Sequence, residues 1–418
     1  MTICGGLKHL VIVAAALPLI ALAASQDAPD LPAPAIAARA IRQAPEVAAG
    51  RAQLTAHEAD RDRLEAGPHE TNLRMEKARR RITPTDQRYP EWNVSLERAV
   101  RMPGKGRLDS ELGEQGVAWA QVALGDSMHE TSRRLLKLWF ASLREQRAET
   151  LWQRQSDIMA RMAEATNKRV KVGDASQLEK LLADSAAAQA AAAARQAQGR
   201  AAVANADLAA RFPGLATPSG LEPMLPESPA QRDWVADILQ HNHELGMARA
   251  ESRRAQLMAQ RADADRLPDP SVGIRVGSEL GGDERVVGLV LSIPLPGSAR
   301  FATARSQNAM ADAAASQEAA VERKVRAEAE TLVAQARAAY DAWERSEAAA
   351  AQARQAAKLT ERAKTLGEAD LAQWLLAQRQ AHEADLNALL ARIDARETAA
   401  RLALDAHQLW DLDEEEPQ

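Results

Sequence analysis

The chain has 418 residues, of which 46% are hydrophobic, 27% are charged and only 3% are aromatic. Its formal net charge is −5 and no basic run alternates with aromatic residues, which excludes a typical nucleic-acid-binding protein. Long tracts of Ala, Arg, Glu and Gln are typical of long helices or coiled coils rather than of a compact mixed core.

Residues 1–23 have the features of a secretory signal peptide. Lys8 supplies a positive charge, Leu10–Ala23 is apolar, and the "ALA" that ends this segment offers a small-x-small cleavage site. An N-terminal membrane anchor is the alternative, although the segment is short for a spanning helix. The only cysteine, Cys4, precedes the apolar segment, so the mature chain is expected to contain no disulfide.

A helix is predicted over roughly Ile36–Ala66 and ends at Pro68, because the residue before a proline avoids the α region. An irregular β-hairpin follows. Residues 72–90 are strongly basic, and Arg98 interrupts the apolar alternation of the return strand. The alternating residues are Val94, Leu96, Val100 and Met102.

A very long helix is predicted over Lys105–Val172, since this stretch contains no proline. At 1.5 Å per residue it would span on the order of 100 Å. A glycine-marked turn leads into the alanine-rich return helix that includes Ser185–Ala210, where small side chains let helices approach closely. Residues 212–231 are dense in Pro, Gly and Ser and indicate a linker.

The same order of elements then recurs. A helix over Arg232–Arg266 is broken by prolines at Leu267–Pro270, and a second proline-free helix is predicted over Ser298–Thr365. The hairpin between them is regular, with a turn at Gly281–Glu284. Its first strand, Ser271–Leu280, alternates cleanly and its return strand ends where Pro294 and Pro296 remove backbone donors. The apolar face is formed by Val272, Ile274, Val276, Val287, Leu289, Leu291, Ile293 and Leu295.

Three sequence matches in the same order indicate an internal duplication with a period of roughly 195 residues. The matching segments are Gln43–Leu54 with His241–Ser252, Trp92–Arg107 with Arg285–Arg300, and Val172–Asp184 with Leu366–Gln378. The predicted organisation is a signal peptide (1–23), a first repeat (24–211), a linker (212–231), a second repeat (232–412) and an acidic tail (413–418).

Each predicted strand is about as long as a tilted transmembrane β-strand requires. Four strands leave edge groups that lipid cannot satisfy, so closure would need identical neighbours; three copies would supply twelve strands. The fold class is therefore predicted to be mainly α with four strands per chain, a long α-helical barrel and a transmembrane β-barrel completed by a trimer. Two alternatives remain, a soluble β-ribbon packed on helices and a free-standing coiled coil.

The duplicated unit, the "LSIPLPGSAR" strand-to-helix junction and the turns "VGDASQLEKLLAD" and "LGEADLAQWLLAQ" together resemble the TolC-like outer-membrane efflux family. The CzcC/CusC-like heavy-metal branch is the most similar. The resemblance implies a homotrimer in the outer-membrane lipid that extends into the periplasm. It also implies docking to a periplasmic adaptor (membrane fusion) protein and, through it, to an inner-membrane pump, with no cofactor and no nucleic acid.

The resemblance also implies roles for particular residues. Glu179 and Gln373 match the positions of a constriction that family members build from aspartates, and Asp174 and Glu368 are further carboxylate candidates. The periplasmic tips, where the adaptor docks, would be formed by Lys171, Val172, Gly173, Asp174, Leu366, Gly367, Glu368 and Asp370. The junction between barrel and helices would be formed by Pro103, Gly104, Pro294, Pro296 and Gly297.

No catalytic motif is present, and no catalytic residue or metal ligand is predicted. His241 and His243 lie two residues apart, but with no third ligand nearby in the sequence they are interpreted as an exposed stretch of helix. Trp139, Phe140 and Trp374 are interpreted as packing residues. The expected function is a passive exit duct, with heavy-metal cations as a candidate cargo. The alternative is a periplasmic coiled-coil adaptor or scaffold without a channel.

Overall fold

The computed structural model describes residues 28–229 and 232–410. The predicted signal peptide, Cys4 and the acidic tail lie outside these residues. The elements are α1 (Pro34–Arg42), α2 (Pro45–Ala66), β1 (Thr71–Ile82), β2 (Gln87–Ala99), α3 (Lys105–Lys171), α4 (Gln177–Arg211), α5 (Trp234–His241), α6 (His243–Ala264), β3 (Ser271–Glu279), the 3₁₀ turn η1 (Leu280–Gly282), β4 (Glu284–Ser292), α7 (Ser298–Leu366) and α8 (Leu371–Asp405).

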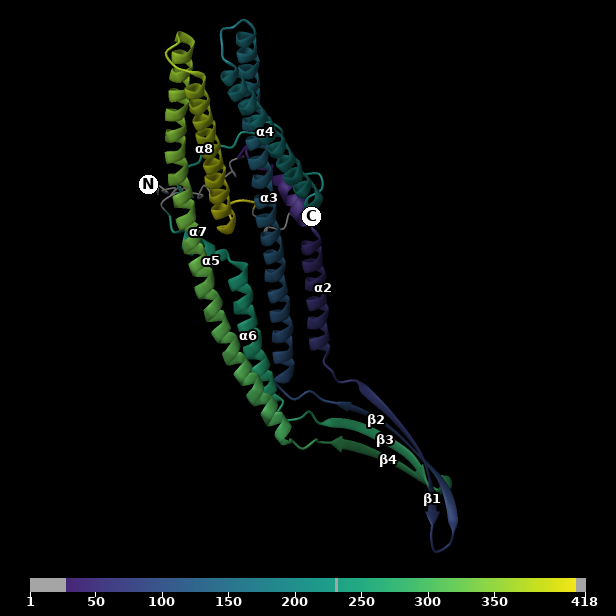
Figure 1. The fold of residues 1–418 in the computed structure, drawn as a ribbon. Helices are drawn as coiled ribbons and strands as arrows, with labels where there is room; N and C mark the ends of the chain where they lie inside the picture. The colour runs from purple at the N-terminus through teal and green to yellow at the C-terminus, as the bar shows by residue number, and fades with distance from the viewer. Residues whose placement is uncertain (1–27, 230–231, 411–418) are drawn as a thin grey trace, which may run out of the picture.

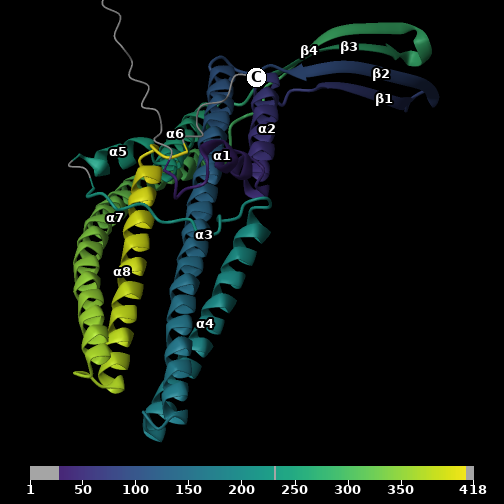
Figure 2. The same cartoon turned by 90° about the horizontal axis from the view of Figure 1, so that it is seen from above.

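The molecule is elongated, with a four-stranded sheet at one end and two helical hairpins, α3/α4 and α7/α8, at the other (Figure 1). α2 and α6 lie between these ends and pack against α3. Figure 2 shows the two hairpins as separate antiparallel pairs that point the same way. Within the described residues, no helix combines the length and the apolar character that a membrane crossing demands.

Both long helices form where they were predicted, within one residue at each end. The two shorter predictions were wrong in the same respect, because each single helix is in fact two. Pro45 starts α2 as a first-turn proline, a position where its missing N–H costs nothing. Asn242 interrupts the second segment: its side chain accepts a hydrogen bond from the Leu245 N–H at 2.8 Å and so caps α6. His241 and His243 therefore flank a helix break.

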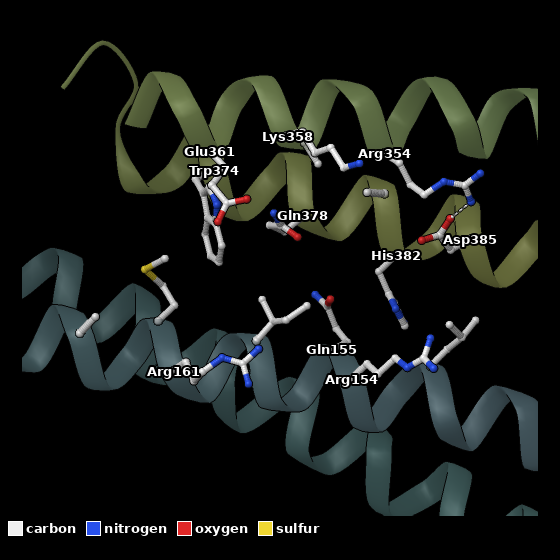
Figure 3. A pocket seen from close by; sticks show the side chains of 16 residues that line it. Arg154, Gln155, Arg161, Arg354, Lys358, Glu361, Trp374, Gln378, His382 and Asp385 are labelled. Carbon is white, nitrogen blue, oxygen red and sulfur yellow. Dashed lines mark hydrogen bonds and ion pairs between the residues drawn. The ribbon is translucent and has the colours of Figure 1, made fainter. Parts of the chain in front are cut away.

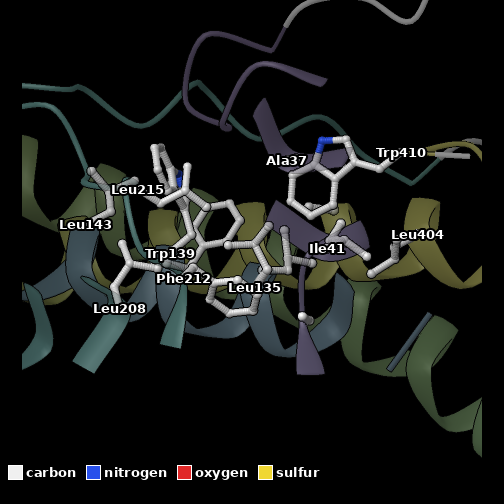
Figure 4. Packing of buried hydrophobic residues seen from close by; sticks show 14 of the residues in the cluster. Ala37, Ile41, Leu135, Trp139, Leu143, Leu208, Phe212, Leu215, Leu404 and Trp410 are labelled. Carbon is white, nitrogen blue, oxygen red and sulfur yellow. The ribbon is translucent and has the colours of Figure 1, made fainter. Parts of the chain in front are cut away.

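The main hydrophobic core lies in the middle of the molecule, where α1, α3, the end of α4 and the end of α8 meet (Figure 4). Trp139 and Phe140 are fully enclosed there, so their interpretation as packing residues is confirmed. The cluster includes Ile41, Leu135, Trp139, Phe140, Leu143, Leu208, Phe212, Leu215, Leu404 and Trp410.

One charged residue is enclosed beside this core. Asp30 has 0% exposure, and both of its carboxylate oxygens accept hydrogen bonds from Arg396 of α8 at 2.8 Å. The Trp139 indole N–H donates to the Asp30 carbonyl oxygen, and the Met224 N–H donates to its carboxylate. The segment before α1, the linker and the last helix are thus joined at a single buried carboxylate, which needs such pairing to be tolerated.

Small side chains form much of the contact between α3 and α4. Four of the six residues that α4 buries are spaced alternately four and three apart, the period of a left-handed coiled coil. They are Ala190, Ala194, Ala197 and Ala201. Alanine at these positions allows the helix backbones to approach closely, as expected from the composition.

Candidate functional site

The two hairpins form one antiparallel sheet in the order β1-β2-β3-β4. β2 of the first half pairs with β3 of the second over eight residue pairs, from Trp92–Ser278 to Ala99–Ser271. The sheet projects away from the helices, as Figure 1 shows, so it is not a ribbon packed on them. Within the chain β1 and β4 each have a neighbour on one side only, which leaves two open edges.

One face of the sheet carries an apolar patch in the half of the sheet nearest the helices. Residues Leu73, Leu96, Ile274 and Leu289 pair directly in a row across all four strands, and Met75, Val94, Val276 and Val287 form the next row. Apart from Val94, these side chains are exposed, up to 90% for Leu289. We call the set the apolar sheet face: Leu73, Met75, Val94, Leu96, Val272, Ile274, Val276, Val287, Leu289 and Leu291. In the far half of the same face, β1 carries the exposed basic residues Lys77, Arg79 and Arg81. An exposed apolar patch that crosses four strands indicates a surface that a partner or lipid covers.

The opposite face, the polar sheet face, carries an ionic and hydrogen-bonded network. Arg80 of β1 contacts Glu91 of β2 at 2.7 Å and Glu279 of β3 at 3.2 Å. The Arg275 guanidinium donates to the Asn93 side-chain oxygen at 2.7 Å. Strands that are apolar on one side and polar on the other match a membrane barrel with a wet interior.

Glycines on this polar face allow the strands to crowd. A Cβ atom added to Gly273 would lie 2.6 Å from the Leu96 carbonyl oxygen, and one added to Gly277 would lie 2.9 Å from the Trp92 carbonyl oxygen. Strand glycines of this kind mark places where backbones approach closely or a sheet bends. They permit the curvature that is visible in Figure 1.

The Arg98 side chain lies on the same face of the sheet as Val94 and Leu96. It pairs directly with Thr71 on β1 and Val272 on β3, and the pairing contains no bulge. It lies at the helix-facing end of the strand, where its guanidinium donates to the His69 carbonyl oxygen at 3.2 Å. The return strand of the second hairpin is shorter than predicted. β4 ends at Ser292, so Ile293 and Leu295 lie in the connection to α7.

The predicted junction residues lie between strands and helices. Gly104 is the N-cap of α3 and has φ +89°, a conformation that favours glycine, whereas Gly297 caps α7 with an extended φ of −105°. Pro103 precedes the first cap, and Pro294 and Pro296 occupy the segment between β4 and α7. The two junctions therefore occupy matching places but differ in backbone conformation.

Beside these junctions, a buried ion network joins the first half of the chain to the second half. The Lys105 ammonium, whose side chain is 2% exposed, lies 2.8 Å from Asp269 and 2.9 Å from Asp265. Asp269 also accepts the Met102 N–H at 3.0 Å and contacts the His69 ring at 2.9 Å. Burial alone would raise the pKa of Asp269, but the hydrogen bonds from Lys105 and Met102 outweigh it and lower that pKa.

The first hairpin tip joins α3 to α4. Gly173 has φ +79°, and the Asp174 N–H closes α3 by donating to the Arg169 carbonyl oxygen at 2.8 Å. Ser176 then starts α4 with a capping box. Its Oγ accepts the Glu179 N–H at 3.1 Å, while Glu179 Oε2 accepts the Ser176 N–H at 2.8 Å.

The second tip, between α7 and α8, repeats this geometry. Gly367 has φ +78°, and the Glu368 N–H donates to the Ala363 carbonyl oxygen at 2.8 Å. The capping box of α8 is formed by Asp370 and Gln373, at 2.7 Å and 3.0 Å. Glu179 and Gln373, the constriction candidates, thus both lie three residues after a helix N-cap. Each side chain accepts the backbone N–H of that N-cap residue, a role that the sequence did not predict.

All eight predicted tip residues are exposed. Two are apolar: Val172 is 79% exposed and Leu366 is 65% exposed. Nearby on α4, Leu178 and Leu181 are exposed as well. Exposed apolar side chains at a hairpin end are typical of surfaces that another protein covers.

A pocket of about 520 Å³ lies between α3 and the α7/α8 hairpin (Figure 3). Arg154, Arg161 and Lys358 line it, and within the described residues none of the three forms an ion pair. Arg354 is paired with Asp385 at 2.6 Å. Glu361 lines the pocket as well, so the lining carries four basic and two acidic side chains and is basic on balance.

Trp374 and His382 mark the same interface. Trp374 is buried beside Met159 of α3, which supports its interpretation as a packing residue. His382 stacks edge-on against Trp152 with ring centroids 4.2 Å apart. Burial lowers the pKa of His382, so its neutral form is favoured between the hairpins.

Two long helical hairpins joined to a four-stranded sheet with open edges define the fold of the TolC-like outer-membrane channels. The resemblance drawn from the sequence is confirmed for the fold by solved structures, although no family model and no curated protein sequence matches the chain.

The solved structures cover nearly the whole chain. The outer membrane protein VceC from Vibrio cholerae is 17% identical, with a TM-score of 0.72 over 90% of this chain and 95% of its own. CusC, which changes conformation during folding and transmembrane channel formation, is 12% identical, with a TM-score of 0.75 over 89% of this chain and 91% of its own. The MtrE outer membrane channel of Neisseria gonorrhoeae is 17% identical, with a TM-score of 0.72 over 91% of this chain and 90% of its own.

Proposed function

We propose that this chain is the outer-membrane channel component of a tripartite efflux system. In this role it is a passive exit duct, anchored in the outer membrane by its sheet and extended into the periplasm by its helical hairpins. The duct performs no chemistry, so its residues act by shape and charge. The observation that carries the proposal is the sheet itself, with an apolar patch across all four strands on one face, a polar opposite face and two open edges.

The strands have 9 to 13 residues, which suits a tilted crossing of the hydrocarbon layer. The apolar sheet face would contact lipid and the polar sheet face would line a water-filled lumen. Unpaired edge groups in lipid cost several kcal/mol each, so β4 of one copy would pair with β1 of the next. Three copies close a barrel of twelve strands.

Cysteine cross-linking tests this closure. Leu289→Cys on β4 is combined in turn with a cysteine at Leu73, Met75, Lys77 or Arg79 of β1, because tilted strands close a barrel only with a staggered register. Each pair is oxidised in isolated outer membranes, and one pair should cross-link. We expect covalent dimers and trimers. The control is Leu96→Cys with Ile274→Cys, directly paired inside one chain, which should give monomers only. A chain that stays in the soluble periplasmic fraction, without cross-links at any β1–β4 pair, contradicts the proposal.

The hairpin tips are the proposed docking surface for a periplasmic adaptor, which would link the duct to an inner-membrane pump. The exposed side chains of Val172 and Leu366 and the matching glycine turns support this assignment. Glu179, near the first tip, would place one carboxylate per copy at the narrow end of the tunnel.

Heavy-metal cations are our candidate cargo, on the strength of the sequence resemblance to the CzcC/CusC-like branch. A wide wet tunnel selects by size and field rather than by coordination, so the pump would set the specificity. A strain that lacks its own channel, complemented with this chain and its neighbouring pump genes, should regain tolerance to zinc or copper. Restored tolerance to organic drugs alone would reject the metal assignment and keep the channel.

A further inference from the structure

Three histidines that are far apart in the sequence meet in the middle of the molecule. His129 comes from α3, His243 is the first residue of α6, and His407 follows the end of α8. One ring nitrogen of each lies within 4.8 Å of those of the other two. The His129 and His407 rings are stacked with centroids 5.2 Å apart, and those of His243 and His407 are 5.0 Å apart.

The helix opposite His243 is shaped around its ring. Gly125 lies in the interior of α3, one turn before His129, where glycine costs about 1 kcal/mol relative to alanine. A Cβ atom at Gly125 would lie 2.7 Å from His243 Cε1 and 2.9 Å from its Nδ1. The absence of a side chain at this position therefore makes the space that the imidazole occupies.

His407 holds an unusual backbone conformation for a residue with a side chain. It has φ +55° and occupies the position after α8 where a glycine normally ends a helix. The Gln408 N–H donates to the Ala403 carbonyl oxygen at 2.8 Å, which completes this type of helix end. A left-handed residue other than glycine costs of order 1 kcal/mol, and such strain is concentrated at functional sites.

A buried carboxylate orients the first imidazole. His129 Nε2 lies 3.2 Å from Asp405 Oδ1, and Asp405 is also held by Arg133 at 2.8 Å. When His129 donates this hydrogen bond, its Nδ1 keeps the lone pair that a metal ion needs. A carboxylate behind a histidine ligand is the usual outer support of a metal site.

From these contacts we propose that His129, His243 and His407 bind one first-row transition-metal ion of the Zn²⁺ class, which joins α3, α6 and the end of α8. Imidazole nitrogens suit zinc, copper and nickel, whereas magnesium and calcium prefer oxygen ligands. Zinc–nitrogen bonds of about 2.0–2.1 Å bring tetrahedral ligands to roughly 3.3 Å from one another. Small side-chain rotations would bring the three ring nitrogens from within 4.8 Å of one another to this distance, and water would complete the coordination. The site is independent of the proposed channel function.

The test uses the full mature chain, purified in detergent without a polyhistidine tag, stripped with a chelator and titrated with ZnCl₂ in competition with a chromogenic chelator. We expect one zinc ion per chain. His129→Gln and His243→Gln should each lower the affinity at least about 100-fold. X-ray absorption of the zinc-loaded protein should report three imidazole ligands.

His407→Gly is the decisive variant, because it relieves the left-handed strain while it removes a ligand. Its metal-free form should melt at or above the temperature of the wild type, yet lose zinc binding to the same extent. The control variants are His241→Gln and His57→Gln. The His241 ring stacks on His407 but is not one of the three proposed ligands, and His57 lies elsewhere, on α2. Both should bind zinc within about threefold of wild type. Wild-type binding no tighter than that of His407→Gly, or equal losses in the control variants, would overturn the proposal.

Discussion

The Lys105 ammonium lies 2.8 Å from Asp269 Oδ1 at the boundary between the helices and the sheet, and the two residues come from different halves of the chain. Both side chains are largely removed from water, at 2% and 11% exposure. Breaking a buried pair from one side leaves an uncompensated charge. This pair and the Arg261–Asp109 pair at 2.6 Å therefore link the two halves of the chain near the junction.

We expect Lys105→Met to destabilise the folded protein by about 3–5 kcal/mol, because Asp269 loses its counter-ion. The measurement is chemical unfolding of the detergent-solubilised protein followed by circular dichroism. Lys180→Met is the matched control: it removes an exposed i,i+4 pair with Asp184 and should change stability by less than about 1 kcal/mol. Equal effects of the two variants would show that the junction pair adds nothing.

Asp269 also predicts a pH dependence. Its pKa is lowered in the folded state, so its contribution is fully present above the ordinary carboxyl value and is lost as the pH falls through the lower folded value. The stability difference between wild type and Asp269→Asn should be constant above about pH 5 and should shrink in more acidic solution. Thermal unfolding of both proteins as a function of pH measures this difference. A difference that stays flat below pH 4 would contradict the assignment.

The two faces of the sheet predict opposite tolerance to charge at neighbouring positions. Leu289→Arg places a guanidinium on the apolar sheet face and should cost about 2–4 kcal/mol if that face meets lipid. Val290→Arg, one residue along and on the polar sheet face, should be accepted. The yield of heat-modifiable protein in outer-membrane fractions reports the difference. Equal yields from both variants would indicate that neither face contacts lipid.

Glu179 combines a capping role with its predicted place in the constriction. Glu179→Gln keeps an acceptor for the Ser176 N–H, so the start of α4 should be unchanged within about 0.5 kcal/mol. If Glu179 faces the lumen of the tunnel, the loss of one negative charge per copy should lower cation-over-anion selectivity in planar bilayers. An unchanged selectivity, with the fold intact, would remove Glu179 from the constriction.

Gly125→Ala tests the space around the proposed metal site without removing a ligand. The added methyl group would displace the His243 ring, so zinc affinity should fall at least about tenfold. Gly199→Ala is the control, since a Cβ atom there meets no neighbour within 4 Å, and it should leave zinc binding unchanged. Undiminished binding by Gly125→Ala would mean that the ring has room to move.

The long helices could be predicted almost to the residue because their ends carry local signals: Gly104 before α3, and Gly173 and Gly367 after the long helices. The helix break at Asn242 was missed because asparagine is compatible with a helix interior, and only its capping hydrogen bond shows that the helix restarts there. The basic β1 was predicted as irregular, yet it pairs without a bulge, because the register is set by the partner strand β2.

The histidine cluster was beyond reach of the sequence for a different reason. Its members come from α3, from the start of α6 and from the turn after α8, and their meeting depends on the packing of α3 against α6 and α8. The sequence interpretation lacked a third ligand for His243, and the structure supplies two, His129 and His407. Gly125 did not stand out in the sequence, because α3 also contains Gly113 and Gly116 in its interior.

The buried contact between Asp30 and Arg396 has a consequence for biogenesis. These residues are 366 positions apart, so the segment before α1 cannot complete its buried contacts until α8 is present. If the chain is exported from its amino end, Asp30 therefore lacks its partner Arg396 until α8 has also crossed. Completion of the core is thereby timed by the arrival of the carboxyl end.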